Sequence, residues 1–251
     1  MYIKSKRIRK IVKAFGRSIP EPEVRYPKDY TSDDIQIIKA VIPFTMVNHE
    51  RLHAVINAAR YVVRNQIPGS IIECGVWKGG CIAAAGLALK LMGESRDFWL
   101  FDTFEGMSKP SEKDRNFSGK QAGHLFQQAQ LTDDSSIWCR CEIDDVKYNL
   151  IQLGLEPEEM KFVKGKVEET LVTDCPKAPI ALLRLDTDWY ESTKAEMEHL
   201  FPLLSRGGVL IVDDYGTWQG AREAVDEYMN RNQINMLLQR IGGGSVVGIK
   251  G

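Results

Sequence analysis

Five short apolar runs, separated by helical segments, constrain the fold of this chain more than any other feature. The runs span residues 70–74, 97–101, 160–163, 180–185 and 209–212. Helical segments are expected between them, near residues 80–92, 143–153, 191–204 and 219–232. Strands that alternate with helices in this way form a doubly wound α/β sheet whose strands are mostly parallel. The glycine triplet at residues 242–244 predicts a C-terminal antiparallel hairpin.

The chain before the first strand is expected to contain a basic arm and two helices. Seven Lys and Arg residues precede the first acidic residue, Glu21, and apolar residues recur between them at helical spacing. We interpret residues 1–19 as a basic amphipathic helix that either contacts an anionic membrane surface or serves as a docking or homodimer contact. Residues 1–30 would form this arm and its linker, and residues 31–251 a single domain. Residues 32–66 should be helical in two pieces, broken near Pro43.

Composition excludes several classes of protein. The 251 residues carry a formal net charge of −1, whereas nucleic-acid binders usually have a basic excess, so no nucleic-acid partner is expected. There is no apolar run of membrane-spanning length and no signal-peptide core. We therefore expect a cytoplasmic protein, which in the membrane-contact interpretation of residues 1–19 would be peripheral to the inner face of the membrane. The odd count of five cysteines favours reduced thiols.

Two acidic clusters follow neighbouring predicted strands. Asp186 and Asp188 come after the run at 180–185, and Asp213 and Asp214 come directly after the run at 209–212. In open α/β sheets, ligands bind at the carboxyl ends of the strands. Four carboxylates gathered there would repel one another unless a cation or protons neutralise them, and oxygen-only ligands suit Mg²⁺. The alternative is that these residues only form turns or helix caps.

A glycine-rich turn follows the first predicted strand. Gly75, Gly79 and Gly80 precede a helix of small residues, and Glu73 lies two residues before the first glycine. A nicotinamide dinucleotide normally requires a Gly-x-Gly-x-x-Gly spacing, which is not the spacing found here. This turn suits a cofactor with an amino-acid tail, whose carboxylate would bind the helix N-terminus and whose ammonium would bind the acid. Asp102, at the end of the second strand, could accept hydrogen bonds from ribose hydroxyls.

The long polar stretch at residues 103–141 follows that second strand. Stretches of this length in compact domains are usually lids or partly helical insertions. Because it leaves the carboxyl end of a strand, we expect it to overhang the acidic clusters and cover the acceptor.

Four sequence strings taken together resemble the macrocin O-methyltransferase family. They occupy residues 72–80, 101–106, 185–193 and 213–215. Members of that family include sugar O-methyltransferases of macrolide and aminocoumarin antibiotic biosynthesis. The resemblance covers roughly residues 40–250. It implies a class I S-adenosylmethionine (SAM) methyltransferase fold, Mg²⁺ dependence and methylation of a sugar hydroxyl.

The resemblance also implies a role for individual residues. Asp186, Asp213 and Asp214 match the metal ligands, and Asp188 matches the general base. The SAM-binding residues fall in a tail-binding turn, a ribose segment and an adenine segment. They are Glu73, Cys74, Gly75, Val76, Trp77, Lys78 and Gly79, then Asp102, Thr103, Phe104 and Gly106, and finally Gly165 and Lys166.

The expected reaction is therefore methyl transfer from SAM to a sugar hydroxyl. Mg²⁺ would stabilise developing charge on the acceptor oxygen while Asp188 accepts its proton. The acceptor could be an antibiotic glycoside, a polysaccharide sugar or a lipid-linked glycan. Three alternatives stay open at this point: a methyltransferase for a non-sugar hydroxyl, an NAD(P)-dependent reductase, and a non-catalytic or nucleic-acid-directed protein of the same fold.

Overall fold

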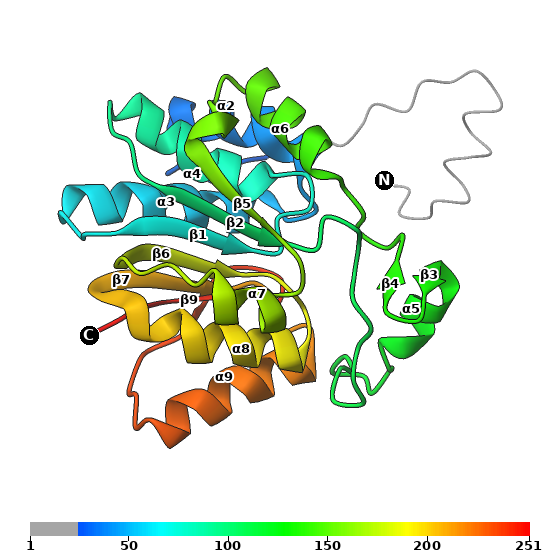
Figure 1. Ribbon diagram of the computed structural model, residues 1–251. Coiled ribbons are helices and arrows are strands. Elements are labelled where there is room, and N and C mark those ends of the chain that lie inside the picture. Colours follow the sequence, from blue (N-terminus) through cyan, green and yellow to red (C-terminus); the bar gives the residue numbers. More distant parts are fainter. Residues whose placement is uncertain (1–24) are drawn as a thin grey trace, which may run out of the picture.

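The computed structural model of the protein describes residues 25–251, so the predicted basic helix at residues 1–19 lies outside the described residues. Within the described part, a seven-stranded sheet forms the centre of the molecule in the order β5-β2-β1-β6-β7-β9-β8 (Figure 1). The strands are β1 (Ser70–Cys74), β2 (Phe98–Asp102), β5 (Met160–Lys164), β6 (Ile180–Leu185), β7 (Leu204–Val212), β8 (Gln239–Arg240) and β9 (Val246–Ile249). The predicted α/β fold is confirmed.

Strand order reverses between β1 and β6, which pair in parallel. From β1 the chain continues through β2 to β5 on one side, and from β6 through β7 on the other. The C-terminal hairpin adds β9 antiparallel to β7, as predicted. The carboxyl ends of β1 and β6 therefore flank the point where the chain turns in opposite directions, which is where doubly wound sheets bind ligands.

Helices cover both faces of the sheet (Figure 1). One face carries α2 (Ser32–Val41), α3 (His49–Arg64), α4 (Gly80–Leu91) and α6 (Ile143–Gln152). The other carries α7 (Val167–Thr173), α8 (Tyr190–His199) and α9 (Gln219–Arg231). Successive side chains of each strand point to opposite faces of the sheet. In β1, Ile71 packs towards α3 and α4, and Ile72 packs towards α8 and α9.

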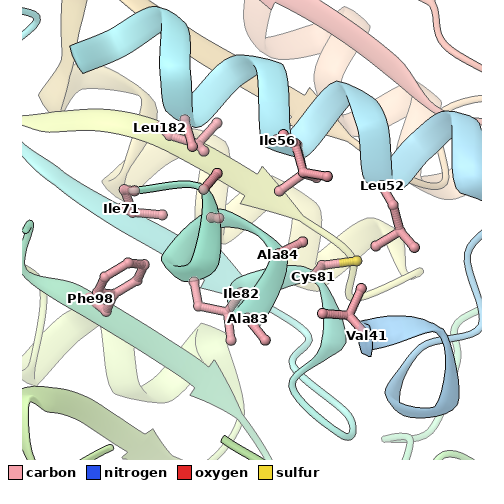
Figure 2. Packing of buried hydrophobic residues seen from close by; sticks show 14 of the residues in the cluster. Val41, Leu52, Ile56, Ile71, Cys81, Ile82, Ala83, Ala84, Phe98 and Leu182 are labelled. Atoms are coloured by element: carbon pink, nitrogen blue, oxygen red, sulfur yellow. The ribbon is translucent and has the colours of Figure 1, made fainter. Parts of the chain in front are cut away.

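The helix α4 packs against α3 on this face of the sheet (Figure 2). Its residues Ala83, Ala84 and Ala85 are buried, and small side chains allow the two helices to approach closely. Around them pack Leu52 and Ile56 of α3 (Figure 2). This packing holds the N-terminus of α4 directly behind the glycine turn.

Two boundaries differ by five residues from the predicted ones, and one helix was not predicted. The strand β7 begins at Leu204 instead of residue 209, because its first half contains Gly207 and Gly208 and so lacks an apolar pattern. The helix α8 ends at His199 instead of residue 204, because Pro202 follows and disfavours helical geometry just before it. The seven-residue helix α7 was not predicted, since it is too short to show helical periodicity.

Residues 103–141 form an insertion that contains α5 (Gly123–Ala129) and a small hairpin of β3 (Gln130–Thr132) and β4 (Ser135–Ser136). It is tied to the loop after β6 by two hydrogen bonds. The indole N–H of Trp189 donates to the Ser108 carbonyl oxygen (3.0 Å), and the Tyr190 amide donates to the fully buried carboxylate of Asp114 (2.8 Å). The insertion therefore contacts the segment that follows the first acidic cluster.

No helix within residues 25–251 combines the length and the apolar character needed to cross a membrane.

The packing of α4 allows a test within one helix. Leu89 is buried (1% exposed) and Leu91 is exposed (61%). Leu89→Ala should lower the free energy of unfolding by about 2–5 kcal/mol, because it leaves a cavity in the core. Leu91→Ala should change it by no more than about 0.5 kcal/mol. Urea denaturation of both variants measures the difference, and equal losses would contradict the packing described here.

Candidate active site

The glycine turn after β1 lies against the loop that carries the first acidic cluster. Gly75 has a φ of +83°, and a Cβ atom placed there would lie 2.1 Å from the Asp186 carbonyl oxygen. Only glycine fits both conditions. The Asp186 amide in turn donates to the Cys74 carbonyl oxygen (2.8 Å). The predicted cofactor turn and the predicted metal ligands are therefore joined through their backbones.

Asp102 at the end of β2 holds this turn in place. Its carboxylate accepts hydrogen bonds from the backbone amides of Val76 (2.7 Å), Trp77 (3.0 Å) and Phe104 (2.7 Å). Burial raises the pKa of Asp102, and these amide hydrogen bonds oppose the rise. The sequence suggested a ribose contact for this residue. The structure adds a positioning role that sequence reasoning missed.

A cavity at the carboxyl ends of β1, β2, β5, β6 and β7 brings most of the predicted site residues together. All four acidic-cluster residues line it. So do nine of the predicted cofactor residues, namely Glu73, Gly75, Val76, Trp77, Asp102, Thr103, Gly106, Gly165 and Lys166.

The other four predicted cofactor residues lie outside the lining. The side chain of Cys74 packs on the sheet face that α8 and α9 cover. Phe104 is buried against Phe162, Gly79 lies beside Val146, and the Lys78 ammonium lies over the Trp77 ring. Glycine at position 79 is nevertheless required locally, because its φ is +86° at the N-terminus of α4.

A buried arginine joins the cofactor side of the cavity to the acidic side. The guanidinium of Arg184, in the middle strand β6, donates to Glu73 Oε1 (2.6 Å) and to Asp213 Oδ1 (2.9 Å), and lies 2.9 Å from Asp186 Oδ2. Glu73 and Arg184 are register partners on β1 and β6, so their side chains share one face of the sheet. Burial raises the pKa of Glu73 to about 7 even though Arg184 opposes the rise. Sequence reasoning missed Arg184, although a single charged residue inside a buried apolar strand was an available signal.

A second arginine reaches the same cluster from α3. Arg51 Nη1 donates to Asp213 Oδ2 (2.5 Å). Burial would raise the pKa of Asp213, but the charges of Arg184 and Arg51 outweigh burial and hold that pKa below its ordinary value. Arg51 lies 162 residues from its partner, and the sequence contains no local signal that could have revealed the pair.

Asp186, Asp213 and Asp214 form the one group in the described residues whose acidic, histidine or cysteine side chains could together hold a metal ion. Each offers a ligand oxygen, and these oxygens lie within 4.8 Å of one another. Burial and repulsion from neighbouring carboxylates raise the pKa of Asp186 and of Asp214 well above the ordinary value. Such a set of oxygens with too few counter-charges fits a hard divalent cation.

Asp188 has an unusual backbone and a defined orientation. Its φ is +67°, in the left-handed region, and its Oδ1 accepts a hydrogen bond from the indole N–H of Trp218 (2.8 Å). Burial, reinforced by the charge on Asp186, raises the pKa of Asp188 to about 7. Because one oxygen is held by Trp218, the side chain presents its other oxygen in a fixed direction.

The aromatic residues near the acids serve packing. Trp189 and Trp218 are buried, and their rings meet edge to face, as do those of Trp189 and Trp138 of the insertion. None of these three tryptophans lines the cavity. Their contacts hold the insertion against the two loops that carry the acidic clusters. Other residues form the wall of the cavity.

Comparison with known proteins confirms the resemblance. The sequence profile of the macrocin O-methyltransferase (TylF) family matches residues 39–247. Mycinamicin III 3″-O-methyltransferase of Micromonospora griseorubida is 31% identical over 195 residues, which cover 77% of this chain and 73% of that protein. Demethyldecarbamoylnovobiocin O-methyltransferase of Streptomyces niveus is 32% identical, covering 76% of this chain and 69% of that protein.

Solved structures agree with this assignment. The O-methyltransferase NovP superposes with a TM-score of 0.72 at 29% identity, covering 82% of each chain. The calicheamicin methyltransferase CalS11, at 19% identity and a TM-score of 0.60 over 94% of this chain and 99% of that one, shows the same fold. These matches set aside the reductase and the non-catalytic alternatives. The chain belongs to the macrocin O-methyltransferase family and is a SAM-dependent O-methyltransferase.

Proposed function

We propose that this protein transfers a methyl group from SAM to a sugar hydroxyl in a reaction that depends on Mg²⁺. The proposal rests on one observation. The glycine turn and four carboxylates line a single cavity, and Gly75 of the turn lies against the backbone of Asp186. A methyl donor bound at the turn would have its reactive end close to the acids. The acceptor hydroxyl must meet it there.

The donor would occupy the β1, β2 and β5 side of the cavity. The N-terminus of α4 supplies free backbone N–H groups for the carboxylate of the amino-acid tail. Glu73, buried and already bonded to Arg184, has a second carboxylate oxygen without a hydrogen-bond partner in the described residues, which suits it to the tail ammonium. Gly165 and Lys166, after β5, line the end of the cavity where the adenine would lie.

The metal would be held by Asp186, Asp213 and Asp214. When bound, a divalent ion at this position supplies Lewis-acid stabilisation for negative charge that develops on the acceptor oxygen. The protein's own contribution is to hold the three carboxylates together before the ion arrives. Arg184 does so by contacting two of them from within the sheet.

Asp188 is the residue we assign as general base. It lines the cavity two residues after Asp186, and its Oδ1 is fixed by Trp218. The remaining oxygen can accept the proton that the acceptor hydroxyl loses as it attacks the methyl group. Fixing the carboxylate in advance reduces the entropy lost when the reacting atoms are aligned.

A sugar acceptor is supported by the relatives. A further relative, 31% identical over 82% of this chain and 75% of its own length, is a Streptomyces olivaceus 4′-O-methyltransferase named for a rhamnosyl-bearing tetracenomycin. Antibiotic glycosides, polysaccharide sugars and lipid-linked glycans all present hydroxyls of this kind. A panel of such glycosides, incubated with protein, SAM and Mg²⁺, tests the assignment by mass spectrometry. Methylation of non-sugar hydroxyls alone would favour the competing acceptor class.

Asp214→Asn should weaken metal binding without disturbing the arginine contacts, since no described Lys, Arg or His forms a salt bridge with Asp214. We expect the affinity for Mg²⁺ to fall by about 10- to 100-fold or more, because one anionic ligand is lost. Isothermal titration of SAM should still give one binding site. The exposed Asp145→Asn is the matched control and should bind Mg²⁺ as the wild type does. Unchanged Mg²⁺ affinity in Asp214→Asn would refute the assigned metal site.

Asp188→Asn should remove the base and preserve the backbone. Asparagine tolerates the left-handed conformation well and can still accept the Trp218 hydrogen bond. We expect kcat to fall by about 10²- to 10⁴-fold, with SAM and Mg²⁺ affinities within a few-fold of the wild type. Radiolabelled methyl transfer measures the rate and calorimetry measures the affinities. A variant with wild-type kcat would show that another group accepts the proton.

A further inference from the structure

We propose that Arg51 is an internal counter-ion that competes with the divalent cation for Asp213 and thereby lowers the metal affinity of the acidic cluster. The proposal rests on the metal site assigned above. Arg51 lies outside the four sequence strings that resemble the family. In this proposal the metal-free protein contains the Arg51–Asp213 ion pair and the metal-bound protein does not.

The two arginines at Asp213 are held very differently. Arg184 contacts three carboxylates, and its side chain is only 5% exposed. Arg51 contacts one carboxylate oxygen, has a long 3.4 Å contact to Ser245 Oγ, and is 20% exposed at the edge of the cavity. The Nε of each arginine is buried with no hydrogen-bond partner in the described residues, so the two differ in the contacts of their terminal nitrogens. Arg184 is therefore built into the sheet, whereas Arg51 is attached through one nitrogen.

Both carboxylate oxygens of Asp213 are bonded to arginines, Oδ1 to Arg184 and Oδ2 to Arg51. A cation ligated by Asp213 therefore has to share an oxygen with an arginine or displace one, and Arg51 is the arginine with fewer contacts. A guanidinium and a divalent ion sharing one carboxylate oxygen would be like charges separated by a few ångströms, which is unfavourable in a partly buried site.

The numbers of charged groups explain why a counter-ion is present at all. Five carboxyl groups line this end of the cavity, those of Glu73, Asp186, Asp188, Asp213 and Asp214. Two guanidinium groups, those of Arg184 and Arg51, face them. Without a bound ion and without Arg51, the cluster would have Arg184 as its one counter-charge among these groups, so Arg51 stabilises the metal-free protein. The cation takes over this neutralisation when it binds, and Arg51 is then released from Oδ2.

Arg51→Gln removes the charge and keeps a polar side chain. It should lower the thermal stability of the metal-free protein and raise its affinity for Mg²⁺. The metal-free variant should have a lower Tm than the metal-free wild type, because Asp213 loses a counter-charge. Its Kd for Mg²⁺, measured by isothermal titration, should be smaller by about tenfold or more, because the competitor is gone. A merely structural contact would lower the Tm and leave the affinity unchanged or weaker.

Arg60→Gln is the matched control. Arg60 lies on the same helix α3 and forms an ion pair with the buried Asp34, away from the cavity. This variant should also lose thermal stability, but its Kd for Mg²⁺ should equal that of the wild type. If Arg51→Gln does not fold without metal, millimolar Mg²⁺ should restore its fold by circular dichroism, and failure to do so overturns the inference.

The outcomes separate this inference from the proposed function. Mg²⁺ binding with equal or weaker affinity in Arg51→Gln than in the wild type overturns the role of Arg51 and leaves the metal site standing. The absence of Mg²⁺ binding in both proteins overturns the metal site and this inference together. Tighter binding in Arg51→Gln, with an unchanged Kd in Arg60→Gln, supports both.

Discussion

The contact of one buried guanidinium with three carboxylates is the interaction on which the site depends. Arg184 lies on β6, between β1 and β7, and bonds to an acid from each of these neighbours as well as to Asp186. Removing one partner from such a network leaves charges buried and uncompensated, at a cost of about 3–5 kcal/mol. The network therefore fixes the spacing between the proposed cofactor turn and the proposed metal ligands.

The close approach of Gly75 to the Asp186 backbone has the same consequence by a different means. A charge network sets where the side chains lie, and a glycine contact sets where the two loops lie. Together they place the methyl donor's turn and the acidic cluster at a fixed separation. Methyl transfer requires the two reacting atoms in line, so a rigid separation between donor and acceptor sites is the feature such an enzyme needs most.

The insertion at residues 103–141 is connected by packing to Asp188, the proposed base. It packs through Trp138 onto Trp189, and Trp189 packs onto Trp218, whose indole N–H orients Asp188. The segment that would cover an acceptor is thus connected through three rings to the group that would deprotonate it. Their burial assigns them to packing.

Local signals in the sequence determined the fold and the ends of the strands. The strands β1 and β6 lie at the predicted residues, because apolar runs bounded by Pro or Gly are visible in a short window. The acids at strand ends were visible for the same reason, and the sheet order then brought them to one cavity. Where the signal was weak, as in the glycine-containing half of β7 or the short helix α7, the prediction failed.

The charge balance of the site was decided only by the tertiary structure. Arg51 meets Asp213 across 162 residues because α3 packs on the sheet, and Arg184 meets Glu73 across 111 residues because β1 and β6 pair in parallel at that register. Such pairs depend on the relative positions of packed elements, and a local pattern contains no information about them. The sequence by itself therefore determined the fold and which acids gather at the strand ends. Packing decided which arginines lie against them and how much negative charge is left for the proposed metal ion to neutralise.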